Sequence, residues 1–295
     1  MSSILTLVAS DPKAHPLTKK HFKEIGTISG FYNIDVTGSP DWLAKHKAAD
    51  IIVSDKPQKA LIEHLRDFLK DDQIDLFVTK PGKRRKKLLL ADMDSTIVSS
   101  ETLDELAAYA GLKDKIAEIT RRAMEGKIDF HAALRERVGL LKGLDATKLQ
   151  ETLQETQVNP GAHKLVEMMR ANNAGSILVS GGFTFFTGAI AKEVGFEFHH
   201  GNVLEIEGGV LTGTVKEPIQ DKNSKLAYLR QYCEDMGLEA EDVLAIGDGA
   251  NDIPMLKAAG LGIGYYPKPA VADAIDNIIL YGDLSACLYA QGYKF

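Results

Sequence analysis

The stretch Leu88-Leu89-Leu90-Ala91-Asp92-Met93-Asp94-Ser95-Thr96 is the segment from which the rest of the chain can be understood. Its apolar half predicts a short, buried strand of a parallel sheet. Asp92 and Asp94 follow at the carboxyl end of that strand, where open α/β sheets place their chemistry. Two buried carboxylates so close repel each other unless a cation or a proton lies between them. A metal-assisted site with one nucleophilic and one proton-shuttling aspartate meets this requirement.

The same residues have a plainer interpretation. Asp and Ser favour turns that cap a following helix, without any role in chemistry. Three later segments of the chain favour the catalytic interpretation.

The bulk composition limits the class of protein. With 295 residues, of which 44% are hydrophobic and 26% charged, the chain is long enough for two globular domains. A net charge of −6 argues against a nucleic-acid binder and against attraction to anionic lipid. No apolar run reaches the roughly 20 residues of a membrane-spanning helix, and the N-terminus lacks the basic start of a signal peptide. The two cysteines, Cys233 and Cys287, fit a reducing compartment, so we expect a cytoplasmic protein without nucleic-acid or membrane partners.

Residues 1–82 are predicted to form a small α+β domain. We expect strands at about 4–8, 31–36, 51–54 and 74–79, with helices at about 15–25 and 58–69. The order β-α-β-β-α-β is the split βαβ pattern of ferredoxin-like folds. It resembles the ACT-type regulatory domains in topology and carries no site motif.

The segment Pro81-Gly82-Lys83-Arg84-Arg85-Lys86-Lys87 marks the boundary to a second domain over residues 83–295. Five consecutive basic residues predict an exposed segment. The acidic total favours a solvated linker, and a targeting or polyanion-binding patch is the alternative.

A helical insertion is expected at about 99–160, directly behind the first core strand, where it would form a cap over the site. Thr102 and Glu105 predict a capping box at the start of its first helix. Arg137 lies in the middle of an apolar helical stripe that begins at Phe130, and a charge there needs a partner. A carboxylate on a neighbouring helix and a ligand carboxylate both meet that need.

Two further strands end in polar residues. The first, at 176–180, ends in Ser180-Gly181-Gly182, which offers a hydroxyl and backbone N–H groups to an anion, although a plain turn has the same sequence. Lys225 follows on a helix predicted to end near residue 236. The second strand, at 243–246, precedes Gly247-Asp248-Gly249-Ala250-Asn251-Asp252, whose carboxylates suit a hard cation. Together these strand ends suit one magnesium ion and one phosphoryl group.

These segments together resemble the four motifs of the haloacid dehalogenase superfamily. The matching segments, in chain order, are Asp92-Met93-Asp94-Ser95-Thr96, Ser180-Gly181-Gly182, Lys225 and Gly247-Asp248-Gly249-Ala250-Asn251-Asp252. The resemblance implies an α/β fold: a Rossmann-like core with a parallel sheet and a helical cap inserted after the first strand.

Within the superfamily, the cap resembles that of the phosphoserine phosphatases. Ser99-Ser100-Glu101-Thr102 matches the segment whose glutamate faces the substrate amino group, although relatives often carry asparagines in place of the two serines. Residues 123–130 and 134–138 match the segment whose arginine binds the substrate carboxylate.

The resemblance implies hydrolysis of O-phospho-L-serine to L-serine and phosphate, the last step of L-serine biosynthesis. It makes Asp92 the nucleophile and Asp94 the general acid/base. It also implies one Mg²⁺ held by Asp92, the Asp94 carbonyl and Asp248, with Asp252 orienting a neighbour of the ion. The implied contacts to substrate and phosphate are Glu101, Met124, Phe130, Arg137, Ser180, Gly181, Lys225 and Asn251.

Two alternatives stay open. One is a phosphatase or phosphotransferase of the same superfamily acting on another small phosphate ester. The other is an amino-acid-sensing module with Asp92 as phospho-acceptor, although a stable acceptor should not carry a poised acid/base such as Asp94 two residues away. The oligomeric state is also open, a homodimer included.

Overall fold

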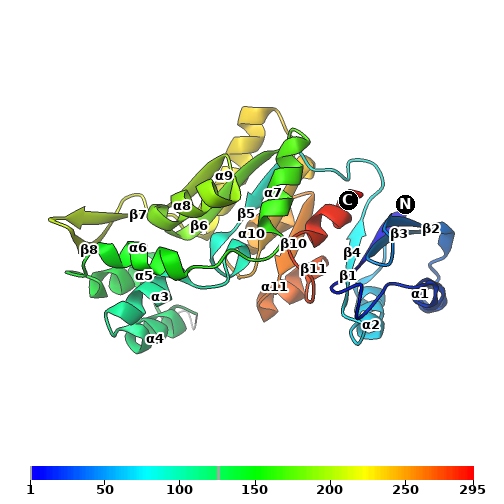
Figure 1. The fold of residues 1–295 in the computed structure, drawn as a ribbon, viewed down its shortest axis with the longest axis horizontal. Helices are drawn as coiled ribbons and strands as arrows, with labels where there is room; N and C mark the ends of the chain where they lie inside the picture. The colour runs from blue at the N-terminus through cyan, green and yellow to red at the C-terminus, as the bar shows by residue number, and fades with distance from the viewer. Residues whose placement is uncertain (1, 125–126) are drawn as a thin grey trace.

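The computed structural model describes residues 2–124 and 127–295, which form two units built on separate sheets (Figure 1). The first unit carries a four-stranded antiparallel sheet, and the second a seven-stranded sheet. No helix within the described ranges is long and apolar enough to cross a membrane.

The first unit has the predicted order of elements. Its sheet order is β2-β3-β1-β4, and the two helices bury an apolar face against it. The elements are β1 (Ser3–Ala9), α1 (Lys19–Phe31), β2 (Val36–Ala44), β3 (Ala48–Val53), α2 (Lys59–Leu69) and β4 (Ile74–Thr79).

Two predicted boundaries in this unit are wrong. The first helix starts at Lys19, with Thr18 as its N-cap, and not near residue 15. The stretch 31–36 is not a strand, because Phe31 ends α1 and Val36 begins β2. Asn33 adopts a left-handed conformation (φ 56°) that turns the chain between helix and strand, and such a turn cannot be seen in apolar periodicity.

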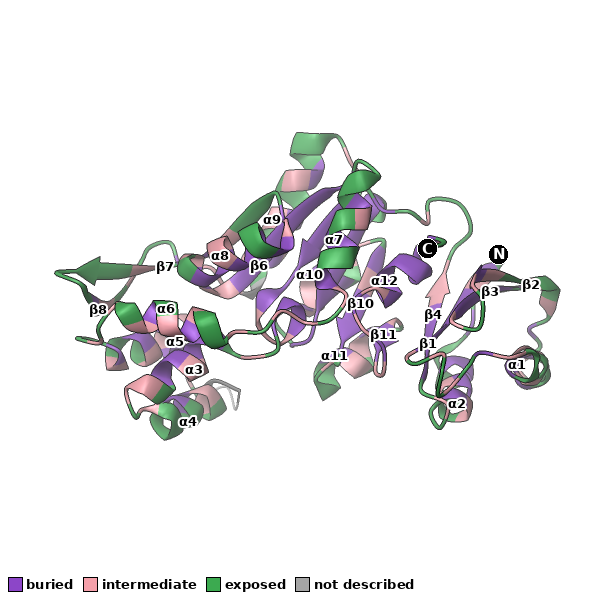
Figure 2. Cartoon of the chain, in the orientation of Figure 1, coloured by how far each residue is buried: buried purple, intermediate pink, exposed green. Residues whose placement is uncertain are grey.

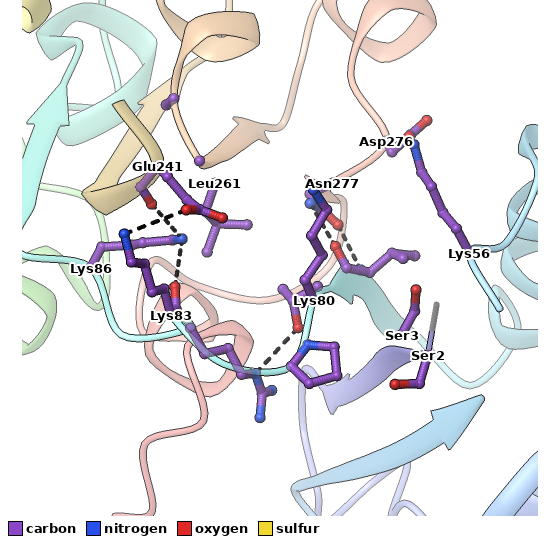
Figure 3. Close-up of a pocket in the computed structure, with 16 residues that line it drawn as sticks. Ser2, Ser3, Lys56, Lys80, Lys83, Lys86, Glu241, Leu261, Asp276 and Asn277 are labelled. Atoms are coloured by element: carbon purple, nitrogen blue, oxygen red, sulfur yellow. Dashed lines mark hydrogen bonds and ion pairs between the residues drawn. The ribbon is translucent and has the colours of Figure 1, made fainter. Parts of the chain in front are cut away.

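The sequence predicted that the whole basic segment 83–87 is exposed, and this prediction is wrong for part of it. Arg84 forms an ion pair with Asp50 of the first unit at 2.5 Å, and only 7% of Lys86 is exposed. The Lys86 ammonium donates to the carbonyls of Lys83 and Glu241, which allows it to be buried (Figure 3). The segment borders a cleft of about 730 Å³. It is more than a solvated linker, because its side chains bind residues of both units.

The second unit is a doubly covered parallel sheet, as predicted. Its order is β11-β10-β9-β5-β6-β7-β8, parallel except for the β7–β8 hairpin at one edge. The central strands are buried (Figure 2), and alternate residues of β5 contribute to the apolar clusters on opposite faces. The strands are β5 (Leu88–Ala91), β6 (Gly175–Phe183), β7 (Phe198–Glu207), β8 (Val210–Lys216), β9 (Val243–Gly247), β10 (Leu261–Tyr265) and β11 (Ile278–Ile279). The helices are α7 (Ala162–Ala171), α8 (Thr184–Val194), α9 (Lys222–Met236), α10 (Ile253–Ala258), α11 (Pro269–Ala274) and α12 (Ala286–Ala290), with short turns η1 (Met93–Ile97) and η2 (Ala240–Asp242).

A helical insertion follows β5 and η1. Its helices are α3 (Thr102–Tyr109), α4 (Lys113–Met124), α5 (Phe130–Leu140) and α6 (Thr147–Glu155). A bridge between Val98 and Val158 brings the two ends of the insertion together, so it leaves and re-enters the core at one place. The predicted capping box is wrong: Glu101 is the N-cap of α3, and the Thr102 hydroxyl binds Asp94 instead.

Candidate active site

Three neighbouring strands end at the same edge of the sheet. β5 pairs in parallel with β9 on one side and with β6 on the other, so Asp92, Asp248 and Ser180 come from adjacent strand ends. After Asp92 the chain enters the turn η1, where Ser95 adopts a left-handed conformation (φ 56°). This turn directs the chain from the strand into the cap.

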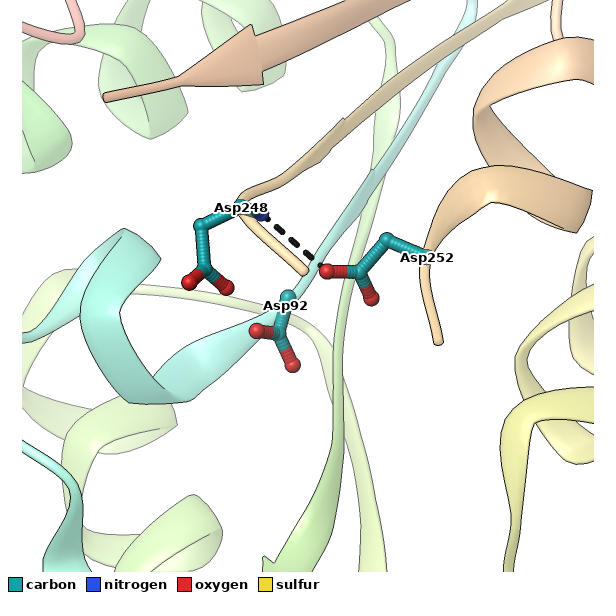
Figure 4. A group of neighbouring side chains, drawn as sticks. All are labelled: Asp92, Asp248 and Asp252. Atoms are coloured by element: carbon teal, nitrogen blue, oxygen red, sulfur yellow. Dashed lines mark hydrogen bonds between the residues drawn. The ribbon is translucent and has the colours of Figure 1, made fainter. Parts of the chain in front are cut away.

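Three aspartates and one lysine form the centre of the site. Carboxylate oxygens of Asp92, Asp248 and Asp252 lie within 4.8 Å of one another, and all three residues are buried (Figure 4). The ammonium of Lys225, itself 2% exposed, contacts Asp92 and lies 2.5 Å from Asp252. Lys225 thus pairs with two of the three carboxylates and Lys268 with the third, so two cations face three carboxylates and negative charge remains in excess at the strand ends.

Asp252 has little capacity left for another ligand. One of its oxygens binds Lys225, and the other accepts the backbone N–H groups of Asp248 (3.1 Å) and Gly249 (3.0 Å). A side chain at Gly247 would collide with the Asp252 carboxylate, so a glycine is required there. Asp252 thus holds Lys225 and the 247–249 loop in place.

Asp92 and Asp248 are better placed to bind a cation. Within the described part of the chain, Lys225 is the only donor to Asp92, and Lys268 is the only cation at Asp248, at 3.0 Å. Each carboxylate therefore keeps an oxygen for a hard divalent ion, whose preferred ligands these are.

The buried charges shift one another's pKa values. Burial, together with the charge of Asp252, raises the pKa of Asp92 well above its ordinary range, against the opposing effect of Lys225. Burial also raises the pKa of Asp248. Although burial alone would lower the pKa of Lys225, the carboxylates of Asp252 and Asp92 raise it, so this lysine stays charged.

Asp94 is held by hydroxyl and amide donors. One oxygen accepts from the Thr102 N–H (2.9 Å) and hydroxyl (2.8 Å), and the other from the Ser180 hydroxyl (2.8 Å). Burial and the nearby charge of Glu101 raise the pKa of Asp94, although these three donors lower it. A half-buried carboxyl group with a raised pKa suits proton transfer. The sequence did not predict the part played by Thr102.

The Ser180–Gly182 segment lies beside this aspartate. The Gly182 N–H donates to the Ser180 hydroxyl at 2.8 Å, and the Asn202 side chain donates to the Gly181 carbonyl at 2.8 Å. Phe130 comes from the cap to cover Gly181, since a Cβ there would lie 3.6 Å from the ring. The structure therefore brings Phe130 and Gly181 together, as expected for a site closed by the cap.

Arg137 is half-buried on α5 and forms no ion pair with any residue that the structure describes. Its only hydrogen bond within the described residues is a long one, 3.4 Å, to the Ala133 carbonyl. Burial lowers the pKa of Arg137, while the charges of Asp104 and Glu101 oppose that shift. A salt bridge to a neighbouring helix, one of the two predicted partners, does not form with any described residue. A ligand carboxylate, the other predicted partner, stays a prediction.

Glu101 and Asp248 share a cation that sequence reasoning missed. The Lys268 ammonium lies 3.0 Å from Asp248 and 3.4 Å from Glu101, and Glu101 also accepts the Ser95 hydroxyl at 2.9 Å. Lys268 follows β10, whose carboxyl end lies at the same edge as the other strand ends. That position was the signal that could have identified it.

Two predicted site residues are less well defined. Asn251 is exposed, and its amide approaches Asp252 only at 3.5 Å. The side chain of Met124 lies outside the described residues. Lys225 comes from α9, and the other predicted site residues belong to the strand ends, the loops that follow them or the cap.

Sequence comparison finds relatives for most of the chain. The sequence profile of the haloacid dehalogenase-like hydrolases matches residues 86–260. A curated phosphoserine phosphatase of Streptomyces coelicolor is 38% identical over 221 residues, which cover 74% of this chain and 54% of that protein. A phosphoserine phosphatase of Saccharomyces cerevisiae is 34% identical over 279 residues, which cover 92% of this chain and 89% of that protein. The chain thus spans about half the length of the first of these relatives and most of the second.

Solved structures agree with this result. A haloacid dehalogenase-family hydrolase of Salmonella enterica serovar Typhi superposes with a TM-score of 0.86 at 26% identity and covers 100% of this chain and 99% of its own. A phosphoserine phosphatase solved as a phospho-aspartyl intermediate analogue superposes with a TM-score of 0.65 at 37% identity, over 70% of this chain and 98% of its own.

Proposed function

The chain belongs to the haloacid dehalogenase-like hydrolases, and we propose that it hydrolyses O-phospho-L-serine to L-serine and phosphate. One observation carries the choice of substrate: the half-buried guanidinium of Arg137 has no carboxylate partner among the described residues and is close enough to Glu101 to respond to its charge. A guanidinium with no carboxylate partner among the described residues, together with a carboxylate whose charge reaches it, matches the carboxylate and ammonium groups of an amino acid. The catalytic role is assigned to residues 83–295, with the cap at about 99–160, and residues 1–82 form the ACT-like unit.

Asp92 acts as the nucleophile. Lys225 favours the ionised form of its carboxylate, which leaves one oxygen for the divalent ion and the other to attack phosphorus. The new bond joins that oxygen to phosphorus, while the bond from phosphorus to the serine oxygen breaks. Lys225 also places positive charge where the transferred phosphoryl group accumulates negative charge.

Asp94 moves the protons. In its protonated form, favoured by its raised pKa, it gives a proton to the departing serine oxygen. The resulting carboxylate then takes a proton from the water that attacks the aspartyl-phosphate. Phosphate leaves, and Asp92 and Asp94 return to their starting states. Ser180 and the Gly181 N–H are assigned to the phosphate oxygens, with Asn251 at the edge of the site.

A divalent metal fits this donor set. Members of this family generally use Mg²⁺, and the residues that would hold it are Asp92, Asp248 and the backbone carbonyl of Asp94. The bound ion would neutralise charge on a phosphate oxygen and on the buried carboxylates. Asp252 would not bind the ion directly, because Lys225 and two backbone N–H groups already use its oxygens. It would instead hold Lys225 in position.

The cap completes the site. Glu101 and Arg137 are assigned to the two ends of the amino acid, and Phe130 and Met124 to the exclusion of water. The proposal also includes a cytoplasmic location, which the two unpaired cysteines support. A homodimer stays a prediction.

A pair of matched arginine variants tests the substrate assignment. Arg135 lies on the same helix as Arg137 but points to the exposed Glu217, at 2.6 Å. Arg137→Ala should lower kcat/KM for L-phosphoserine by on the order of 2–4 kcal/mol, which is roughly 30- to 1000-fold, because a desolvated contact to the carboxylate is lost. Arg135→Ala should leave it within about twofold.

Three outcomes separate the alternatives. Turnover selective for phosphoserine over phosphothreonine and a sugar phosphate, and abolished by Asp92→Asn, supports the proposal. Equal rates on all three esters, with Arg137→Ala unchanged, would leave a phosphatase of another ester. A single stoichiometric release of serine, with the phosphoryl group kept on Asp92 and no turnover, would favour the phospho-acceptor alternative.

A further inference from the structure

Asp75 is a buried carboxylate of the first unit that belongs to neither the site nor its sheet's core. It lies on β4, is 2% exposed, and accepts three backbone N–H groups from the second unit. These come from Leu280 (2.8 Å), Tyr281 (3.2 Å) and Gly282 (2.8 Å). Three consecutive amides on one carboxylate fix the loop 280–285, which follows β11, against the first unit.

The other side of this loop contacts Pro160 and Gly161, the point at which the cap insertion returns to the core and which we call the cap hinge. The Leu284 N–H donates to the Pro160 carbonyl at 3.1 Å. Gly161 leaves no room for a side chain, since a Cβ there would lie 2.5 Å from the Ser285 nitrogen and 2.7 Å from the Asp283 carboxylate. Pro160 and Gly161 stand where the cap insertion returns to the core, next to the Val98–Val158 bridge.

The same loop forms part of the wall of a cleft at the active site. This cleft has a volume of about 640 Å³, and its lining includes Ser10 of the first unit, Tyr281 and Gly282 of the loop, and Asp248 and Lys268 of the site. The strand before the loop is tied to the same region, because the Tyr266 N–H donates to the Ile279 carbonyl at 2.9 Å. Contacts thus run from β4 through this loop to the cap hinge.

We propose that Asp75 is a positioning residue of the active site: by fixing the loop 280–285, it sets the cap hinge at Pro160–Gly161 and so the place of the cap's substrate-binding groups. The proposal rests on the proposed function. It predicts a defined kinetic effect, because Glu101 and Arg137 move with the cap while Asp92, Lys225 and Asp248 belong to the core. Loss of Asp75 should weaken substrate binding and spare the chemical step.

Other contacts hold the two units together without the loop. Arg84 binds Asp50, and the exposed Lys294 binds Asp41 at 2.9 Å. Asp75→Ala should therefore release the loop and leave the units joined. Asp41→Asn, which removes a contact between the units away from the loop, is the matched control.

The experiment combines hydrogen exchange with kinetics on the full chain. In Asp75→Ala, the backbone amides of residues 280–284 and those of Val158, Asn159 and Gly161 should exchange at least about tenfold faster than in the wild type, as expected when a local tether is lost. KM for phosphoserine should rise about three- to tenfold with kcat within about twofold, the pattern of lost uniform binding. kcat/KM for p-nitrophenyl phosphate, which lacks the amino-acid groups, should not change. Asp41→Asn should match the wild type in all three.

If the alanine variant does not fold, Asp75→Asn replaces it, because asparagine keeps the side-chain volume and one acceptor oxygen. The same changes in exchange rate and KM are then expected, with smaller magnitude. The proposal would be overturned if a folded variant exchanged its loop amides faster but its amides at 158–161 at the wild-type rate. An unchanged KM for phosphoserine would also overturn it. Hydrogen exchange does not depend on the substrate. A wild type inactive on phosphoserine would therefore count against the proposed function, while the exchange at the hinge still decides the role of Asp75.

Discussion

Thr102 donates two hydrogen bonds to one carboxylate oxygen of Asp94, from its backbone N–H at 2.9 Å and from its hydroxyl at 2.8 Å. Thr102 is the first residue of the cap's first helix, and Asp94 lies in the turn after the first core strand. The group that shuttles the proton in the proposed reaction is therefore held by the base of the cap.

This pair predicts a shifted pH profile for Thr102→Val. Hydrogen bonds to the ionised carboxylate lower its pKa, so loss of the hydroxyl should raise the pKa of Asp94 further. The step that needs ionised Asp94 then begins at higher pH, so the acidic limb of kcat moves upward, and the maximal rate falls about tenfold. Steady-state phosphate release measured across the active pH range checks this.

A second threonine of the cap provides the control. The Thr120 hydroxyl binds the Ile116 carbonyl within its own helix at 3.0 Å. Thr120→Val should keep the wild-type profile. An acidic limb that stays in place in Thr102→Val would show that the hydroxyl does not influence Asp94.

The carboxylate cluster predicts stabilisation by magnesium. An ion between Asp92 and Asp248 relieves their mutual repulsion and binds only the folded chain, so saturating Mg²⁺ should add about 1.5–3 kcal/mol to the free energy of unfolding. Asp248→Asn should lose most of this gain. Thermal or urea unfolding with Mg²⁺ and with EDTA measures it. Asp242→Asn, at a buried aspartate paired with Lys87 outside the cluster, should respond to Mg²⁺ like the wild type.

Asp75 predicts a stability that falls as pH rises. Burial raises its pKa from 3.8 to about 6, although the three backbone N–H groups oppose the shift. The folded chain therefore binds more protons than the unfolded chain between these values, and stability decreases with pH across that window. The loss reaches about 3 kcal/mol, from 1.36 kcal/mol per pKa unit.

Asp75→Asn isolates this effect, because it does not titrate. The difference in unfolding free energy, wild type minus variant, should fall from about pH 4 to pH 6 and stay level above it. Urea unfolding at a series of pH values gives this difference directly. A difference that rises with pH would mean that the three amides outweigh burial and hold the carboxylate ionised.

Much of the core and of its site could be predicted from sequence because the signals are local. The apolar runs at 88–91 and 243–246 are strands β5 and β9, and parallel strands bring their carboxyl ends to one edge. Asp92 and Asp248 therefore had to be neighbours. The insertion behind β5 folds as helices because its apolar residues recur with helical spacing.

Residues whose importance depends on distant partners could not be predicted in this way. The capping-box interpretation of Thr102 was reasonable from spacing, but the hydroxyl binds Asp94 because the turn η1 brings that carboxylate within reach. Lys86 was expected in solvent, yet main-chain carbonyls that the fold places around it satisfy its ammonium. In both cases a non-local acceptor changed the local preference.

The amino-acid sequence by itself determined the order of elements in the two units and the place of the cap insertion. It also determined which aspartates lie at the strand ends and which lysine lies on α9. Periodicity and motif spacing are properties of neighbouring residues, so they can be recognised without the fold. Only the tertiary structure decided that Lys268 lies between Glu101 and Asp248, that Arg137 has no ion pair among the described residues, and that Asp75 holds a loop from the far end of the chain. Such contacts join residues up to 207 positions apart, and their energies depend on burial and geometry that no local pattern records.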